Sequence, residues 1–300
     1  MKLTVIVPVH NERANIAPFY DRAKRVLQSL QGLDDWAVVF VNDGSGDGSL
    51  EEILKLRAHD DHVKVITLSR NFGYHAVLVA GLSQVESDLY AVVDVDCEDP
   101  PELLEKFYEA IRGGAQVAYG IRSNRQEPWL ITLGRKFFYL ANRHIADGEI
   151  VVWMAEFSMI TKQVRDAILR PHTTYPFLRA EIGYVGFKRV GIPYFRAQRQ
   201  HGRSHYNILS MTKFAVAGIL SSSTFPLRFV MYLAVFIGLA FPLCVLAMGL
   251  TRSGVVTMAA LVSLYFLLLS VPLISLYLAR TYKNVVSRPV FVIDKDQTFL

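Results

Sequence analysis

The chain has 300 residues, enough for one full α/β catalytic domain and an appendage. It is 52% hydrophobic and 20% charged, more apolar than an average soluble domain, and residues 229–279 carry most of the excess. The net charge of +5 fits nucleic acid, phosphorylated substrates or an anionic membrane, but Lys and Arg gather after residue 120, beside the apolar part. This favours a membrane or a phosphate-bearing substrate, and we expect no nucleic acid partner.

Short β-branched runs alternate with segments of helical spacing through the first part of the chain. This alternation predicts an α/β fold with a mostly parallel sheet and helices on both of its faces. In such sheets ligands bind at the carboxyl ends of the strands, so the loops after the first, second, third and fourth strands are expected to form one site. The expected strands are 3–8, 36–42, 63–68, 89–93 and 117–119, and the expected helices are 15–30, 50–59, 73–84 and 100–112.

The middle of the chain is less regular. We expect a helix at 130–145, a strand at 157–160, a helix at 162–169 and a strand pair ending near Phe195. These elements complete a catalytic domain over residues 1–205, and an amphipathic segment at 206–227, interrupted by Pro226, is expected to lie in a membrane interface.

Two uncharged runs, 229–250 and 255–279, are each long enough to cross a bilayer. Together they predict a transmembrane hairpin over 228–280, followed by a tail at 281–300. Arg228 precedes the first helix, and Arg280, Lys283 and Arg288 follow the second, so the positive-inside rule puts the catalytic domain and the tail in the cytoplasm, at the plasma membrane. The alternative is a buried helical hairpin of a soluble protein.

Asp94 and Asp96 flank one residue at the end of the fourth expected strand. Carboxylate oxygens in this arrangement suit Mg²⁺ or Mn²⁺ bridging a diphosphate, and such a metal neutralises charge on a departing nucleoside diphosphate. The alternative interpretation is a solvated acidic turn.

Two other loops follow strands in the same way. Asp43, in a glycine-rich turn, can accept hydrogen bonds from a nucleobase or ribose, and Glu12 can reach a ribose hydroxyl. Their alternative roles are helix capping and a charge in a first helical turn. The glycines form neither a Walker A loop nor a dinucleotide fingerprint, which argues against ATPases and dinucleotide enzymes.

A basic cluster stands just before the apolar part. It can clamp a phosphate at the membrane surface, or it can simply meet anionic headgroups. Its members are Arg196, Arg199, His201, Arg203 and His205.

Taken together, these motifs resemble glycosyltransferase family 2 with its GT-A, Rossmann-like fold. The resemblance rests on Val-Ile-Val-Pro-Val-His-Asn-Glu (5–12), Val-Asn-Asp-Gly-Ser (41–45), Leu-Ser-Arg-Asn-Phe-Gly (68–73), Asp-Val-Asp-Cys-Glu-Asp-Pro-Pro-Glu (94–102) and Tyr-Gly-Ile-Arg (119–122). The segment Arg-Gln-His-Gly-Arg-Ser-His-Tyr (199–206) before a two-helix anchor is similar to the polyprenyl-phosphate branch, which includes dolichyl-phosphate mannose synthases and bacterial undecaprenyl-phosphate glucosyltransferases.

The resemblance implies an enzyme that inverts the anomeric centre while moving a sugar from a UDP- or GDP-linked donor to a polyprenyl phosphate, undecaprenyl rather than dolichyl. Three positions depart from the family pattern: His205 where Lys is usual, Glu98 for Gln, and Glu156 for Asp. The implied roles are nucleotide binding for Pro8, Glu12, Asp43 and Asp94, metal and diphosphate binding for Asp96, and contact with the diphosphate or acceptor phosphate for Arg122, Arg135, Arg199 and His205.

Two other functions remain open at this point. A processive polysaccharide synthase usually carries Gln-x-x-Arg-Trp, whereas none of Trp36, Trp129 and Trp153 follows an Arg here. A non-catalytic lipid-binding or flippase-associated membrane protein would not need the carboxylates Asp94 and Asp96. Small residues in the hairpin, such as Gly238, permit packing into a homo-oligomer.

Overall fold

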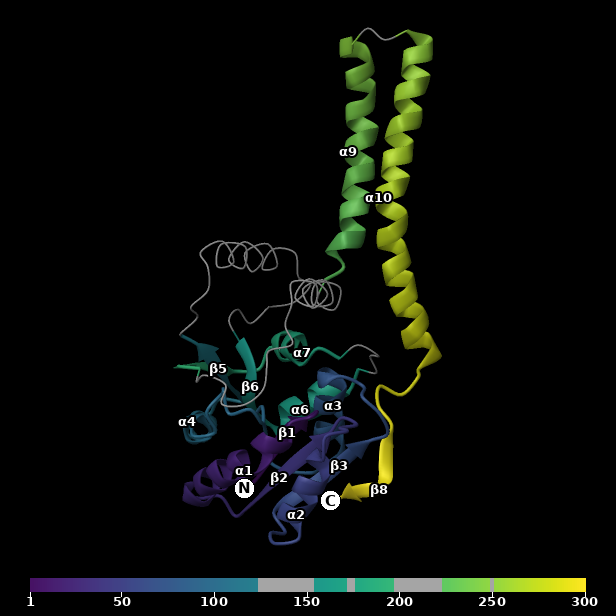
Figure 1. Ribbon diagram of the computed structural model, residues 1–300. Coiled ribbons are helices and arrows are strands. Elements are labelled where there is room, and N and C mark those ends of the chain that lie inside the picture. Colours follow the sequence, from purple (N-terminus) through teal and green to yellow (C-terminus); the bar gives the residue numbers. More distant parts are fainter. Residues whose placement is uncertain (124–153, 172–175, 197–222, 249–250) are drawn as a thin grey trace.

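The first part of the chain alternates strands and helices as expected (Figure 1). The computed structural model describes residues 1–123, 154–171, 176–196, 223–248 and 251–300. Every strand and helix predicted before residue 122 is present, with ends shifted by at most a few residues. The elements are β1 Lys2–Val9, α1 Arg13–Ser29, β2 Asp35–Asn42, α2 Ser49–Arg57, β3 Val63–Leu68, α3 Tyr74–Gln84, β4 Leu89–Val92, α4 Leu103–Arg112 and β5 Val117–Arg122.

The second part differs from the prediction in one place. The expected strand pair ending near Phe195 is wrong: a helix, α7, precedes a single strand, β7. Leu178 and Ile182 of α7, four residues apart, are buried on one helical face. The expected helix at 130–145 lies outside the described residues. The elements are β6 Met154–Thr161, α6 Lys162–Leu169, α7 Leu178–Tyr184, β7 Arg189–Tyr194, α9 Phe225–Met248, α10 Arg252–Val286 and β8 Ile293–Phe299.

The described strands form one mixed sheet in the order β7-β5-β6-β4-β1-β2-β3-β8. The pairs β1–β2, β1–β4, β2–β3 and β5–β7 are parallel, while β6 and β8 pair antiparallel with their neighbours. The carboxyl ends of β1, β2, β3 and β4 therefore meet at one edge, which is the edge where a site was expected.

Helices cover both faces of the sheet because its central strands are apolar on both sides. Leu3, Val5 and Val7 of β1 pack with α1, α2 and α4, whereas Ile6 packs with α3, α6 and α7. Helix α3 lies especially close to the sheet, since a Cβ at Gly81 would meet the Ile6 side chain at 2.5 Å. The expected α/β fold is therefore confirmed.

The helices α9 and α10 form a hairpin that projects from the α/β domain (Figure 1). Both are long and apolar enough to cross a membrane, with mean hydropathy of 2.5 and 2.3 in windows that are 0% and 6% buried. This exposure contradicts the alternative of a buried soluble hairpin. Helix α9 begins at Phe225, so Pro226 lies in its first turn, where a missing N–H is tolerated. The expected amphipathic segment lies outside the described residues up to residue 222.

The C-terminal tail contains a strand that was not predicted. Strand β8 follows α10 and pairs antiparallel with β3 at the edge of the sheet. Thr67 anchors it twice: its N–H donates to Thr298 Oγ1 at 3.0 Å, and its hydroxyl donates to the Gln297 carbonyl at 2.7 Å. The chain therefore returns from the hairpin to the sheet of the α/β domain.

Candidate functional site

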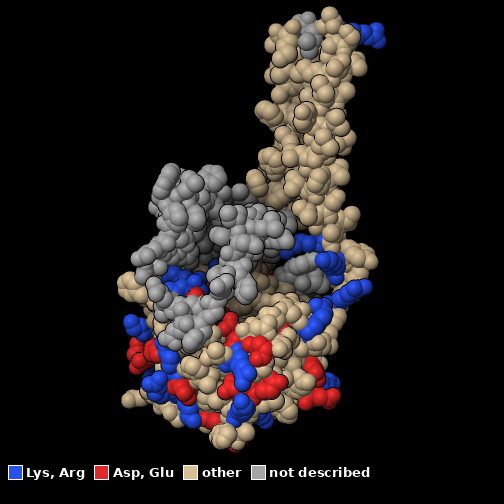
Figure 2. Space-filling view, viewed as in Figure 1, with Lys and Arg blue, Asp and Glu red and all other residues tan. Residues whose placement is uncertain are grey.

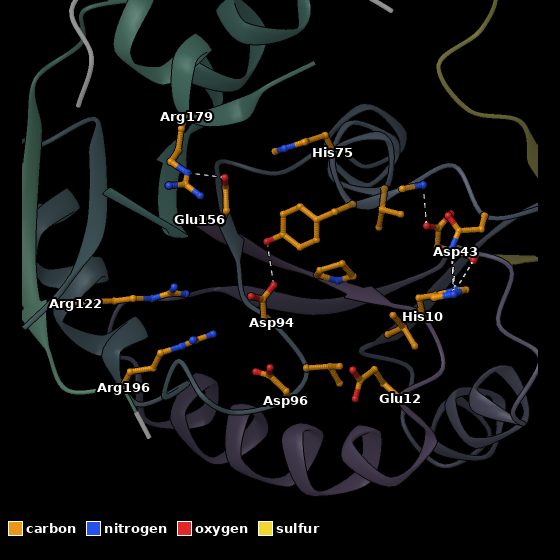
Figure 3. Close-up of a pocket in the computed structure, with 17 residues that line it drawn as sticks. His10, Glu12, Asp43, His75, Asp94, Asp96, Arg122, Glu156, Arg179 and Arg196 are labelled. Atoms are coloured by element: carbon orange, nitrogen blue, oxygen red, sulfur yellow. Dashed lines mark hydrogen bonds and ion pairs between the residues drawn. The ribbon is translucent and has the colours of Figure 1, made fainter. Parts of the chain in front are cut away.

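A cavity of about 570 Å³ opens at the carboxyl ends of the central strands. This volume lies within the range typical of small-molecule sites. Loops from distant parts of the sequence converge on it (Figure 3). The predicted residues Pro8, Glu12, Asp43, Asp94, Asp96 and Arg122 all line it, and Arg135, Arg199 and His205 lie outside the described residues.

One wall consists of two loops that are tied together. The Asn11 backbone N–H donates to Ser45 Oγ at 3.0 Å, and its side chain accepts from the Gly46 N–H at 2.9 Å. Asn11 adopts a left-handed conformation with φ of 57°, which asparagine tolerates better than most residues. The Glu12 N–H donates to Ser49 Oγ at 3.0 Å, so the start of α2 holds the backbone of Glu12 in place.

Asp43 holds the loop between β3 and α3. Its two carboxylate oxygens accept from the backbone N–H groups of Phe72 at 2.7 Å and Gly73 at 3.0 Å. The side chain is only 3% exposed. Asp43 therefore lies at the predicted place, and it shapes the wall of the cavity through contacts that the sequence did not reveal.

His10 joins the same three loops, and the prediction missed it. Its Nδ1 lies 2.9 Å from the Asp43 carbonyl oxygen, which only accepts, so this nitrogen carries the proton. Its Nε2 then accepts from the Asn71 amide at 3.0 Å. Gly44 completes the junction, because its φ is 62° and a Cβ there would lie 2.7 Å from the Arg70 carbonyl carbon.

Three carboxylates gather in the middle of the cavity region. Burial, together with the charges of Asp99 and Asp96, raises the pKa of Asp94 to about 7. The Tyr74 hydroxyl donates to Asp94 at 2.9 Å, and Asp96, 7% exposed, accepts from the Glu98 N–H at 3.1 Å. Negative charge is therefore concentrated around Asp94.

This concentration of charge suits a divalent cation. Asp94 and Asp96 both line the cavity, but no group of three or more His, Cys, Asp or Glu side chains among the described residues has the arrangement of a complete metal site. A cation here would take part of its coordination from a diphosphate and water, as Mg²⁺ in phosphate sites usually does. The residues thus fit a divalent metal ion that binds together with a diphosphate-containing substrate.

Positive charge lies beside the carboxylates. Arg122 donates to Asp99 at 2.9 Å and to the Tyr194 hydroxyl at 3.0 Å. Burial alone lowers the pKa of Arg122, but Asp99 and Tyr194 outweigh it and raise that pKa, so the guanidinium stays charged. Arg196, from the basic cluster, pairs with Glu98 and lines the same cavity.

A second ion pair lines the end of the cavity farthest from Glu12 and Asp43. Glu156 on β6 accepts from Arg179 Nε on α7 at 2.6 Å. Next to them, burial lowers the pKa of His75. The sequence marked Glu156 only as a departure from a motif, and it gave no sign of Arg179, because α7 was not predicted. His75 lies on the predicted helix α3, but nothing in its sequence context singled it out.

The chain belongs to glycosyl transferase family 2, whose family model matches residues 4–173. This confirms the family that the motifs predicted. The fold agrees, because glucosyl-3-phosphoglycerate synthase from Mycobacterium tuberculosis, in complex with Mn²⁺, UDP-glucose and phosphoglyceric acid, superposes with a TM-score of 0.51 at 18% identity, covering 73% of this chain and 79% of that chain.

Two relatives match along almost their whole length. The uncharacterized glycosyltransferase YkcC of Bacillus subtilis (strain 168) is 30% identical over 306 residues, which cover 99% of this chain and 94% of that protein. The SfII prophage-derived bactoprenol glucosyl transferase of Shigella flexneri is 30% identical over 308 residues, covering 99% and 98%. These similarities include the C-terminal hairpin.

Proposed function

We propose that this protein transfers a sugar from a nucleotide-sugar to the phosphate of a polyprenyl carrier, undecaprenyl phosphate above all, at a membrane surface. One observation carries the proposal: Asp94 and Asp96 lie in a cavity between the loops after β1 and β2 and several arginine side chains. The same chain has two helices that are long and apolar enough to cross a membrane. The full-length similarity to a bactoprenol glucosyl transferase supports this acceptor.

The donor nucleotide occupies the side of the cavity formed by Pro8, Glu12 and Asp43. Glu12 is pre-positioned for a ribose hydroxyl, since its carboxylate is already held by the Asn15 amide at 2.5 Å. Asp94 and Asp96 then face the diphosphate, where a bound Mg²⁺ or Mn²⁺ ion would neutralise the charge that develops on the leaving group. A UDP-linked donor agrees with the UDP-glucose in the M. tuberculosis structure of the same fold.

The acceptor phosphate approaches from the arginine side. Its oxygen is already anionic at neutral pH, so it attacks the anomeric carbon without a strong general base, and the bond from that carbon to the diphosphate oxygen breaks. A single displacement inverts the anomeric centre. Arg122 lies where it can orient the phosphate, and we assign Arg135, Arg199 and His205 the same electrostatic task.

The hairpin brings the active site to the lipid. We propose that α9 and α10 cross the membrane with their connecting turn on the far side and the catalytic domain in the cytoplasm. Figure 2 shows that the length of the hairpin carries almost no charged side chains, whereas Lys or Arg side chains lie at its tip and at its base. The base carries more of them, with Arg228 on α9 and Arg280 and Lys283 on α10, as the positive-inside rule requires.

A transfer assay tests the proposal. Full-length protein in detergent is incubated with undecaprenyl phosphate, Mg²⁺ or Mn²⁺, and labelled nucleotide-sugars, beside Asp96→Ala and the exposed control Asp61→Ala. We expect label in the lipid fraction, with the rate falling about a hundredfold or more in Asp96→Ala, because metal-assisted stabilisation is worth several kcal/mol. Folded protein that binds donor with metal but labels no lipid would contradict the proposed acceptor.

A further inference from the structure

The far end of the cavity carries a carboxylate with an open acceptor position. Glu156 is 9% exposed and lines the cavity. Its Oε1 accepts from Arg179, whereas its Oε2, shielded from water, accepts a hydrogen bond from no described residue. A carboxylate has about four acceptor positions, and a buried unmet acceptor costs free energy. A donor group on a bound ligand can meet this need once the side chain turns slightly toward the cavity.

The strand register places Glu156 relative to Asp94, and this position indicates which part of a nucleotide-sugar would reach Glu156. Ser158 of β6 pairs with Val92 of β4, and the two strands are antiparallel. Continuing this register by two positions sets Glu156 across from Asp94, just beyond the end of the ladder. Figure 3 shows His10, Glu12 and Asp43 on one side of Asp94, and Glu156 with Arg179 on the other. A donor whose nucleotide lies on the first side and whose diphosphate lies near Asp94 therefore extends its sugar toward Glu156.

Arg179 fixes the chemical character of this position. Its Nε donates to Glu156, and its Nη1 donates to the Met154 carbonyl at 3.1 Å, so the guanidinium is anchored to the strand that carries Glu156. The guanidinium occupies Oε1 as a donor, so the carboxylate presents Oε2 to a ligand as a hydrogen-bond acceptor. The matching ligand group is an O–H or N–H donor, and a sugar offers several.

We infer that Glu156, oriented by Arg179, is a specificity-determining residue that accepts a hydrogen bond from a hydroxyl group of the transferred sugar. The inference rests on the proposed function for the nucleotide-sugar donor only, and it does not depend on the acceptor. His75 completes this wall, with its ring centroid 5.0 Å from that of Phe177. Burial lowers the pKa of His75, so a neutral imidazole adds no second cation beside the carboxylate.

Binding measurements without acceptor test the inference. Dissociation constants of UDP, UDP-glucose, UDP-galactose, UDP-N-acetylglucosamine, GDP and GDP-mannose are measured by calorimetry with full-length protein and Mn²⁺. We expect the wild type to distinguish sugars that differ at one hydroxyl. Glu156→Gln should reduce that discrimination about tenfold or more, the scale of a hydrogen bond to a charged group, and should leave the affinity for the parent nucleotide within about twofold.

Glu181→Gln is the matched control, since it removes a carboxylate from the same helix as Arg179 but outside the residues that line the cavity. Unchanged discrimination in Glu156→Gln, lost nucleotide affinity in that variant, or a wild type that ignores the sugar would each overturn the inference. Intact sugar discrimination without transfer to any polyprenyl phosphate would contradict the proposed acceptor and leave this inference standing.

Discussion

At the scale of single residues, acidic side chains hold the walls of the cavity in place before any substrate binds. Asp43 binds two backbone N–H groups, and Asp99, 1% exposed, binds Arg122 and the Tyr194 hydroxyl. Groups that are ordered in advance lose less entropy when a ligand arrives. Asp99 therefore orients Arg122, and in the proposed function it would act on the acceptor phosphate through that arginine.

Asp43 is expected to matter for stability even without nucleotide. Asp43→Ala leaves the partly buried N–H groups of Phe72 and Gly73 without their acceptor, at a cost of about 1 kcal/mol each. We predict a lower thermal midpoint in the absence of ligand and a higher KM for the donor. The exposed Asp21→Ala is the control. An unchanged midpoint together with a raised KM would show that Asp43 contacts only the nucleotide.

The sequence predicted the residues at or shortly after the carboxyl ends of strands, because strand ends are recognisable and meet at one edge. Pro8, Glu12, Asp94 and Asp96 belong to this group. The clamp made by Asp43 was not predictable, because its partners lie about thirty residues further along the chain. Arg179 was missed because it comes from a short helix whose packing depends on tertiary contacts.

At the scale of elements, β8 links the membrane hairpin to the cavity. It pairs with β3, and the Ser69 N–H donates to the Val292 carbonyl at 2.9 Å. Ser69 lies two residues before Asn71, which lines the cavity. Phe72 and Phe291 pack on the same apolar cluster. The strand therefore supports the loop that Asp43 holds from the other side.

Removal of β8 is expected to loosen this loop. A chain ending at residue 290 loses the hydrogen bonds at Thr67 and Ser69, so we predict a donor KM several times higher and faster proteolysis near residue 70, with membrane insertion retained. The control Lys295→Ala alters an exposed side chain of β8 and keeps the pairing. Wild-type KM and protease resistance in the truncated chain would contradict a supporting role.

The sequence did not predict β8 because the strand is mostly polar. Ile293–Phe299 reads Ile-Asp-Lys-Asp-Gln-Thr-Phe, which has no alternating apolar pattern. An edge strand of this kind is stabilised by backbone pairing with its neighbour, and that neighbour is more than two hundred residues away. The central strands were predictable because both of their faces are buried and their sequences are continuously apolar.

At the scale of the whole molecule, the hairpin is closed at its base by a hydrogen bond and is tied to the α/β domain by β8. Tyr277 of α10 donates to the Ser223 carbonyl at 2.6 Å, just before α9, and β8 docks on the sheet after α10. The 35 residues of α10 span about 52 Å, more than the roughly 30 Å of a bilayer core. In the proposed arrangement its last turns leave the membrane and hold the cavity close to the lipid phosphate.

The central claim is that the bond between sugar and diphosphate breaks while the lipid supplies its own phosphate. The most direct measurement uses a donor carrying ¹⁴C in the sugar and ³²P in the phosphate next to it, with undecaprenyl phosphate and full-length protein. We predict that ¹⁴C enters the lipid fraction and all ³²P stays in the water phase as nucleoside diphosphate. Both labels entering the lipid together would show transfer of a sugar phosphate, and it would contradict the account.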